Sequence, residues 1–236
     1  MAISVLIGVQ SRSGSTRLPN KAFELISGRT MLDRVIEGCK NAANFIEKRH
    51  QGVKAAVCVV TPKGDKIGDD FRGRVTVFEG DEFDVLSRYM VAVNALKPDY
   101  LVRVTGDCPL IPPATIEGSV NLALKYEYDY VSNVDETCRT TVDGVDCEVI
   151  SRRAMEWLNE TARTPTDREH VTPMLRKFPP SWCHHGAIMS SIDMSGIKLS
   201  VDTKEDLERV RAIFAAGYSK YQAACEKFGR IRVHRL

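Results

Sequence analysis

The sequence has no apolar run long enough to cross a membrane and no paired-cysteine motif. Its first apolar run, Ile3 to Val9, is far shorter than the roughly 20 residues of a spanning helix, and no basic segment precedes it as in a signal peptide. The seven cysteines are an odd number with no CxxC pair, which indicates neither a disulfide framework nor a zinc knuckle. We therefore expect a cytoplasmic protein with no membrane partner.

An excess of one charge is also missing. The 236 residues include 33 Lys and Arg against 31 Asp and Glu, which leaves a net charge of +2. Proteins that bind nucleic acid through its phosphates rely on a basic surface, so we expect no nucleic-acid partner. Any basic site must be local.

Strand-like and helix-like segments alternate along the chain. The β-branched run Ile3 to Val9 has the composition of a strand buried on both faces and ends in a polar loop. Similar runs lie at 55–60, 75–78 and 100–104, and segments with helical spacing lie at 31–43, 84–96, 113–126, 151–162, 167–178 and 203–215. This alternation predicts an α/β fold with a mostly parallel, Rossmann-like sheet flanked by helices.

The region from about 130 to 200 interrupts this alternation. Strand-like segments at 129–134, 147–150, 183–189 and 198–201 are interleaved there with two of the helical segments. No Gly-, Pro- or Ser-rich linker separates the region from the rest, so we expect a single domain over residues 1–236. The region is then a β-rich elaboration that either extends the sheet or forms a lid or dimerisation surface.

The loop after the first strand is rich in groups that bind anions. Open parallel sheets bind ligands at the carboxyl ends of their strands, and this loop places Arg12, Arg17 and Lys21 there among serines and one glycine. Backbone N–H groups, hydroxyls and fixed positive charges suit a polyphosphate. The loop has neither the GxxxxGK[ST] pattern of a P-loop nor the GxGxxG pattern of a dinucleotide fold. A solvated surface turn is the alternative.

Two carboxylates follow strand-like segments. Asp107 comes after the strand-like run 100–104, and Asp202 comes after 198–201. If these strands are neighbours, two carboxylates about 4 Å apart would repel by about 4 kcal/mol unless a cation lies between them. Mg²⁺ is commonly held by one or two carboxylates together with substrate phosphates. The alternatives are a turn residue for Asp107 and a helix N-cap for Asp202.

Seven motifs carry a resemblance to a known family. The string Gly14-Ser15-Thr16-Arg17-Leu18-Pro19-x-Lys21 resembles the signature loop of the cytidylyltransferases that make CMP-activated sugar acids, such as 3-deoxy-manno-octulosonate cytidylyltransferase and the sialic acid synthetases. The others are DVLxRY at 84–89, RVTGDCPLI at 103–111, YVSN at 130–133, DGVDCEV at 143–149, DREHVTP at 167–173 and VDTxxDL at 201–207. Together they cover most of the chain and are similar to the branch named after spore coat polysaccharide biosynthesis protein F.

The resemblance implies a GT-A-like nucleotidyltransferase fold and a reaction. The enzyme would transfer CMP from CTP to a small acidic sugar of the ulosonic or nonulosonic type and release pyrophosphate, with Mg²⁺ as cofactor. It would act as a homodimer in the synthesis of a surface polysaccharide or glycan. Two alternatives stay open, namely another acceptor, such as a sugar phosphate or a polyol phosphate, and a non-catalytic nucleotide-binding subunit.

The resemblance also implies roles for individual residues. Asp107 and Asp202 would hold the metal, and catalysis would rest on Arg12, Arg17, Lys21 and Asp107. The nucleotide would contact Gln10, Ser11, Arg12, Ser13, Gly14, Ser15, Lys21, Asp84, Arg88, Thr105 and Gly106. The acceptor would contact Asn133, Asp146, Glu148, Arg168, Glu169 and His170. For Asp84 and Arg88, an intrahelical ion pair is the alternative, and for 167–170 a solvated first turn of a helix.

Two parts of the loop depart from the family pattern. Relatives often have a Gln-Ala-Arg opening and a Gly before the signature lysine, where this chain has Gln10-Ser11-Arg12 and Asn20. Serine in place of alanine is a small change. Asn adopts left-handed backbone angles more readily than most residues. We therefore expect Asn20 to replace that glycine and the loop to keep its shape.

Overall fold

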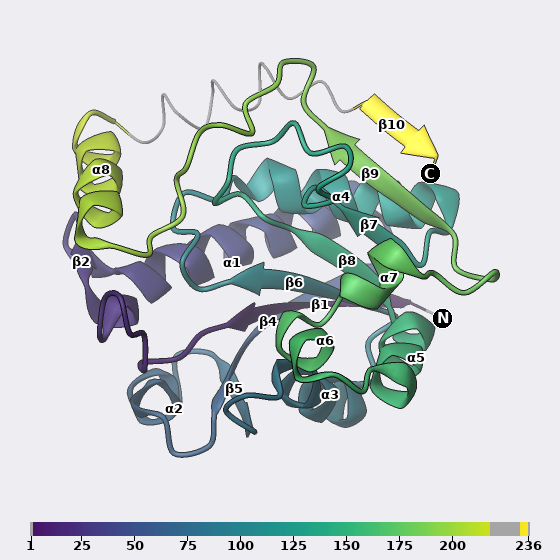
Figure 1. Cartoon of the computed structure of the whole chain (residues 1–236), viewed down its shortest axis with the longest axis horizontal. Helices are drawn as coiled ribbons and strands as arrows, with labels where there is room; N and C mark the ends of the chain where they lie inside the picture. The colour runs from purple at the N-terminus through teal and green to yellow at the C-terminus, as the bar shows by residue number, and fades with distance from the viewer. Residues whose placement is uncertain (1, 218–231, 236) are drawn as a thin grey trace.

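A single eight-stranded sheet runs through the computed structural model, which describes residues 2–217 and 232–235 (Figure 1). The strands of this sheet are β1 (Ile3–Gln10), β4 (Val53–Pro62), β5 (Thr76–Gly80), β6 (Tyr100–Thr105), β7 (Tyr130–Ser132), β8 (Glu148–Ser151), β9 (His185–Met189) and β10 (Arg232–Arg235). A separate hairpin consists of β2 (Leu25–Ile26) and β3 (Arg29–Thr30). The helices are α1 (Met31–Arg49), α2 (Lys66–Phe71), α3 (Val85–Leu96), α4 (Pro113–Tyr126), α5 (Arg152–Thr161), α6 (Pro165–His170), α7 (Pro173–Lys177) and α8 (Lys204–Ala215), with a 3-10 turn η1 at Lys21–Phe23.

Most neighbouring strands are parallel, as the alternation of segments predicts. The order across the sheet is β10-β9-β7-β8-β6-β1-β4-β5, in which β8 and β10 run opposite to their neighbours. From β1 the chain moves outward to β4 and β5, then returns to the other side of β1 as β6. Such a reversal of direction is where open α/β sheets bind ligands, at the carboxyl ends of the strands. The carboxyl ends of β1 and β6 therefore mark the expected site.

Helices cover both faces of the sheet. Helices α1 and α4 pack on one face, and α3 with α5 and α6 packs on the other (Figure 1). Val5 and Ile7 of β1 belong to the core beneath α1 and α4, whereas Leu6 belongs to the core beneath α3. Side chains of a strand alternate between the two faces, so β1 is buried on both sides and reads as a continuous apolar run.

The structure corrects two secondary-structure predictions. The predicted helix 167–178 is two helices, α6 and α7, because Val171 between them has φ of 69°. The predicted strand 198–201 is not a strand, and only an isolated bridge joins Lys198 to Asp143. The other three strand-like segments of the middle region form β7, β8 and β9, which extend the main sheet. Within the described residues, no helix is both long and apolar enough to span a membrane.

Candidate functional site

The loop after β1 is held in place by its own backbone and by Asp65. The backbone N–H and the hydroxyl of Ser13 donate to Asp65 Oδ2 at 2.9 and 3.0 Å, and the Ser13 carbonyl accepts from the N–H of Asn20 at 3.1 Å. Asn20 has φ of 57° and ψ of 23°, the left-handed conformation that its place before Lys21 predicts. Asp65 also caps α2, so α2 anchors the loop. Sequence reasoning missed Asp65, because the short helix that it caps was not predicted either.

Lys21 lies between the two predicted metal-binding carboxylates. Its Nζ donates to Asp107 Oδ2 at 3.0 Å, to Asp202 Oδ1 at 3.2 Å and to the carbonyl of Val201 at 2.7 Å. The Lys21 side chain is 15% exposed. Three acceptors satisfy the three N–H bonds of an ammonium group, so the contact set of Lys21 is complete.

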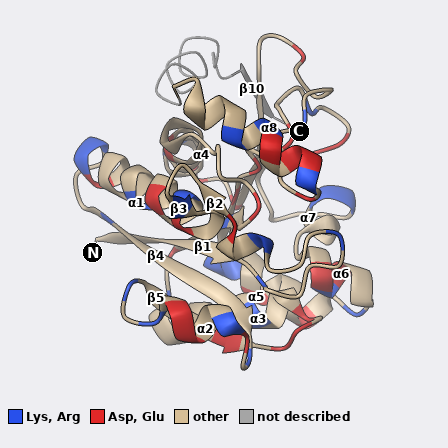
Figure 2. Cartoon of the chain, turned by 90° about the vertical axis from the view of Figure 1, so that its left-hand side faces the viewer, with Lys and Arg blue, Asp and Glu red and all other residues tan. Residues whose placement is uncertain are grey.

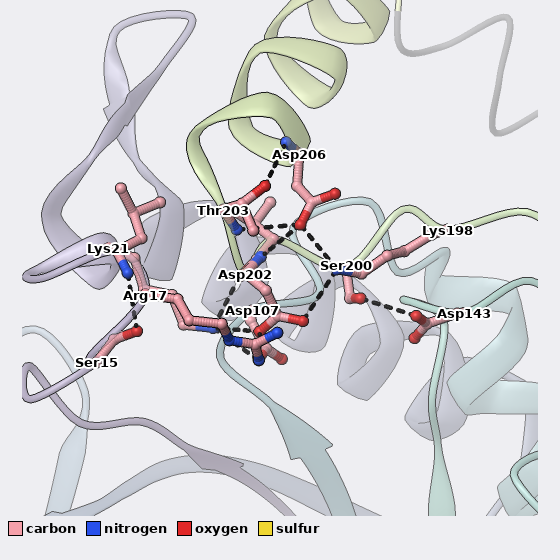
Figure 3. Close-up of polar contacts among 12 residues, drawn as sticks. Ser15, Arg17, Lys21, Asp107, Asp143, Lys198, Ser200, Asp202, Thr203 and Asp206 are labelled. Carbon is pink, nitrogen blue, oxygen red and sulfur yellow. Dashed lines mark hydrogen bonds and ion pairs between the residues drawn. The ribbon is translucent and has the colours of Figure 1, made fainter.

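Asp202 contacts more cationic side chains than Asp107 does. Arg17 contacts its Oδ1 at 2.9 Å, and Lys198 contacts its Oδ2 at 3.1 Å from the other side (Figure 3). Burial acts to raise the pKa of Asp202, but Lys198 and Lys21 together hold that pKa below its ordinary value. Asp206 accepts from Lys198 and from the backbone N–H of Asp202 at 2.7 and 3.1 Å, which fixes the backbone at the start of α8.

Hydrogen bonds and close backbone packing, rather than a strand, bring Asp202 beside Asp107. The N–H of Val201 donates to the carbonyl of Asp107 at 2.9 Å. On the other side, Leu199 N–H donates to the Asp143 carbonyl at 2.7 Å, and a Cβ at Gly144 would lie 2.3 Å from the backbone nitrogen of Ser200. A residue with a side chain at 144 would push segment 199–201 away, because real Cβ atoms do not approach so closely. Figure 2 shows the molecule from the side of the carboxyl ends of β1 and β6, with the acidic first turn of α8 in view.

These carboxylates and cations line a cavity of about 360 Å³ at the carboxyl ends of β1 and β6. Thirteen of the predicted site residues line it, namely Gln10, Ser11, Arg12, Ser15, Arg17, Lys21, Arg88, Thr105, Gly106, Asp107, Glu169, His170 and Asp202. Thr16, Met31, Glu82, Val85 and Arg103 line it as well. The predicted anion-binding loop and the predicted carboxylates are therefore parts of one site.

Gly106 allows the two strand ends to meet. Its N–H donates to the carbonyl of Gln10 at 2.8 Å, and a Cβ at this position would lie 2.7 Å from the hydroxyl oxygen of Ser11. A side chain at 106 would separate the loop after β1 from the turn after β6. The predicted contact of Gly106 with the nucleotide thus rests on its backbone.

Arg88 is the least solvated cation of the cavity. The residue is 3% exposed, burial lowers the pKa of its guanidinium, and no carboxylate forms an ion pair with it among the described residues. One of its N–H groups donates to the carbonyl of Glu82 at 3.1 Å, while Nε has no partner within residues 2–217 and 232–235. A buried donor without a partner costs about 1 to 3 kcal/mol. The structure does not form the alternative ion pair with Asp84, which pairs with Arg168 instead, and Arg88 lines the cavity.

Arg103, which sequence reasoning missed, orients Gln10. Its Nε donates to Gln10 Oε1 at 3.0 Å, and its guanidinium pairs with the buried carboxylate of Glu148. Glu148 also accepts from Thr172 at 2.6 Å, pairs with Arg176 at 3.0 Å and is 1% exposed. Its contacts are internal, so Glu148 acts here by holding Arg103. A charged residue within an otherwise apolar central strand was the signal for Arg103.

Helix α6 brings Glu169 and His170 to the cavity, and Arg168 anchors the helix. Arg168 pairs with Asp84 at the start of α3 and donates to Asn159 Oδ1 at 3.2 Å. Neither Arg168 nor Asp84 lines the cavity. Directly after α6, Val171 has a positive φ, which is a strained conformation for a β-branched residue. The chain turns at Val171, and the hydroxyl of Thr172 then donates to Glu148.

The other predicted site residues lie outside the cavity lining. Asn133 is 2% exposed, and both ends of its amide bond the backbone, at Val145 and Cys147. Asp146 pairs with Arg139 at 2.7 Å, and burial raises its pKa to about 6. Ser13 holds the loop through Asp65, and neither Ser13 nor Gly14 lines the cavity. The geometry gives no support for direct substrate contact by Asn133, Asp146 or Glu148.

The two carboxylates fit a small divalent cation. The Lys21 ammonium already occupies a cation position between Asp107 and Asp202, where hard oxygen atoms converge. In residues 2–217 and 232–235, no group of three or more Asp, Glu, His or Cys side chains is arranged to hold a metal. Few protein ligands, completed by phosphates and water, are the usual environment of Mg²⁺. Asp107 and Asp202 would hold the ion.

A cation-rich loop and a carboxylate pair lie together at the reversal point of a Rossmann-like sheet, as expected for a nucleotidyltransferase. The chain belongs to the cytidylyltransferase family, whose model matches residues 6–228. It is similar to a cytidylyltransferase structure from Leptospira borgpetersenii, with a TM-score of 0.78, 26% identity and full coverage of both chains. It is 25% identical to the spore coat polysaccharide biosynthesis protein SpsF of Bacillus subtilis, over 89% of this chain and 86% of the relative. It is 32% identical to the 3-deoxy-manno-octulosonate cytidylyltransferase of Bartonella henselae, over 91% of this chain and all of the relative.

Proposed function

We propose that this cytidylyltransferase transfers CMP from CTP to a hydroxyl group of an acidic sugar, releases pyrophosphate and uses Mg²⁺. The observation that carries the proposal is the position of Lys21 between Asp107 and Asp202, inside an arginine-lined cavity at the strand ends. The names of two relatives, one for 3-deoxy-manno-octulosonate and one for spore coat polysaccharide, support a sugar acid in surface polysaccharide synthesis.

The cations of the cavity would bind the triphosphate. Arg12, Arg17 and Lys21 come from one loop, and Arg88 approaches from α3 with an unpartnered Nε. Phosphate oxygens would complete the hydrogen bonding of Arg88. Fixed positive charges stabilise the negative charge that develops on the leaving pyrophosphate, and no covalent intermediate with the protein is needed.

Mg²⁺, when bound by Asp107 and Asp202, would supply further positive charge beside the phosphates. The protein's part is to hold the two carboxylates ready. The N–H of Val201 and the ammonium of Lys198 fix Asp202, while Gly106 fixes the turn that carries Asp107.

The acceptor would enter from the side of α6. Glu169 and His170 line the same cavity as the loop after β1, so a sugar placed between them and the triphosphate has its hydroxyl near the reacting phosphate. Arg168 positions this helix against α3. Holding both reactants in one cavity removes much of the entropic barrier of a bimolecular step.

The test is pyrophosphate release with each of the four nucleoside triphosphates, crossed with ulosonic acids, sugar phosphates and polyol phosphates, with and without Mg²⁺. We expect turnover with CTP and a ulosonic or nonulosonic acid only when Mg²⁺ is present. Asp107→Asn should lose most of this activity. Turnover with a polyol phosphate instead would change the acceptor class, and CTP binding without any turnover would favour a non-catalytic nucleotide-binding subunit.

We further propose a homodimer and a cytoplasmic location. Strand β9, in the elaboration from 130 to 200, lies near one edge of the sheet, which makes this region the candidate dimerisation surface. Light scattering on the purified protein tests the dimer, and cell fractionation tests the location. A monomer at micromolar concentration would contradict the first proposal.

A further inference from the structure

The Lys21 ammonium occupies the position that a divalent cation needs. Its Nζ lies 3.0 Å from Asp107 Oδ2 and 3.2 Å from Asp202 Oδ1, the two carboxylates assigned to the metal. A metal ion bound to both carboxylates would have to occupy the space that the Lys21 ammonium fills. The two cations cannot share it, since like charges repel at such short range. Metal binding therefore requires that Lys21 moves.

The surrounding charges also oppose a free metal ion. Arg17 and Lys198 contact opposite oxygens of Asp202, so this carboxylate already faces three cationic side chains, including Lys21. A divalent ion arriving alone would meet this positive charge with only two carboxylates to offset it. A nucleoside triphosphate brings its own negative charge, which reverses the balance.

Lys21 is well placed to change partners. It begins the 3-10 turn η1, directly after the loop that carries Arg12 and Arg17, and its flexible four-carbon stem reaches into the cavity that would receive the phosphates. A phosphate oxygen offers the ammonium a charge-assisted hydrogen bond comparable to the one it leaves. The backbone of the loop need not move for this exchange.

We propose that the site takes its divalent ion only together with a nucleoside triphosphate, because the phosphates must first draw Lys21 away from Asp107 and Asp202. Without the nucleotide, Lys21 excludes a free metal ion from the two carboxylates. This inference rests on the proposed function for the identity of the nucleotide. The exclusion of free metal by Lys21 depends on neither CTP nor the acceptor.

The first test measures Mn²⁺ binding to the nucleotide-free protein from the electron paramagnetic resonance signal of unbound Mn²⁺. Mn²⁺ is a suitable probe because it shares the preference of Mg²⁺ for carboxylate oxygen. We expect Lys21→Met to bind Mn²⁺ at least about tenfold more tightly than the wild type, a difference of about 1.4 kcal/mol. Arg12→Met is the matched control, since Arg12 is a cation of the same cavity that contacts Glu82 and not the two carboxylates. Its affinity for Mn²⁺ should stay within about twofold of wild type.

The second test uses the wild-type protein and does not depend on the folding of any variant. Mn²⁺ binding is measured with and without CTP, and the binding of Mn²⁺ to CTP alone is subtracted. We expect CTP to tighten Mn²⁺ binding beyond that of CTP in solution. Equal Mn²⁺ affinity of the nucleotide-free wild type and Lys21→Met, with circular dichroism showing both folded, would overturn the proposal, as would tight binding of free Mn²⁺ to the wild type.

The two proposals fail in different ways. If the protein prefers another nucleotide or another acceptor, the activity panel changes, but the tighter Mn²⁺ binding of Lys21→Met remains. If Lys21 does not exclude the metal, the panel is unaffected while the difference in Mn²⁺ binding disappears.

Discussion

Replacing Glu148 with glutamine should destabilise the protein strongly, although the change keeps the shape of the side chain. Glu148 is 1% exposed and forms ion pairs with both Arg103 and Arg176, whose side chains are 13% and 19% exposed. Without the carboxylate, two largely buried guanidinium groups lose their counter-charge. Breaking a buried pair in this way costs about 3 to 5 kcal/mol.

The loss is measurable by thermal and urea unfolding at pH 7. For a domain of this size, 1 kcal/mol shifts the midpoint by about 2 to 4 °C, so we expect a fall of about 6 to 20 °C. Glu24→Gln is the matched control, because Glu24 pairs with Arg211 at a more exposed position, with 38% of its side chain accessible. That change should cost no more than about 1 kcal/mol.

The pH dependence gives a second signature. Burial acts to raise the pKa of Glu148, but Arg103 and Arg176 bring it below its ordinary value. A lowered carboxyl pKa stabilises the fold above the unfolded pKa of about 4.3, and this stability is lost as the pH falls through the folded value. The difference in stability between wild type and Glu148→Gln should therefore shrink below about pH 4.

A loss of less than about 1 kcal/mol at pH 7 would refute the role given to Glu148. The variant should also lower kcat/KM with CTP, since Arg103 would no longer hold Gln10 in the cavity. A fully stable variant with reduced activity would indicate instead that Glu148 contacts a substrate.

Other changes test separate parts of the site. Arg88→Met should weaken CTP binding about 10- to 100-fold by calorimetry, the worth of a charge-assisted hydrogen bond. The variant should be at least as stable as the wild type, because no carboxylate in the described part of the chain pairs with Arg88. Lower stability with unchanged affinity would contradict this. Burial raises the pKa of Asp146 to about 6, so the wild type should lose stability as the pH rises from about 4 through about 6. Asp146→Asn cannot ionise and should not show this loss. Identical pH profiles of the two proteins in urea unfolding would count against it. Because Asn20 has a positive φ, Asn20→Gly should be as stable as the wild type, and Asn20→Val should be about 1 to 2 kcal/mol less stable. Equal stability of Asn20→Val and the wild type would refute the backbone argument.

The sequence predicted the parts of the site that depend on short segments. The apolar run of β1, the cationic loop after it and the acidic turn after β6 are each local, and the rule that ligands bind at strand ends was enough to bring Arg12 and Asp107 together. The left-handed Asn20 was also predictable, because its reason is the backbone preference of a single residue.

The predictions that failed depend on context. The break between α6 and α7 had a signal in Pro173, since a proline disfavours helix at the residue before it, but the apolar pattern across 167–178 favoured one helix. The pattern of 198–201 alternates like a strand, whereas only the backbone at Asp143 and Asp107 pairs with it. Alternation shows which side chains are buried, but it does not show whether a partner strand is present.

Ion pairs that form only when helices pack together could not be predicted from the sequence. Arg168 pairs with Asp84, 84 positions earlier, only because α6 lies against α3. Neither residue carries a signal for the other, and a guanidinium suits a substrate carboxylate as well as a protein one. In the structure these contacts of Arg168 hold the helix that carries Glu169 and His170, and its contact with the substrate stays a prediction.

The positive and negative side chains at the centre of this site are already paired with each other. Lys21 reaches Asp107 and Asp202 across 86 and 181 positions of sequence, so these three side chains are paired with one another before any ligand binds. A nucleotide must exchange these internal pairs for its own phosphates and metal, and its affinity is the difference between the two sets of contacts rather than the sum of the new ones. Under the proposed exchange of Lys21, selectivity follows from charge, because a ligand that brings both an anion and a divalent cation satisfies Lys21 and the two carboxylates at the same time.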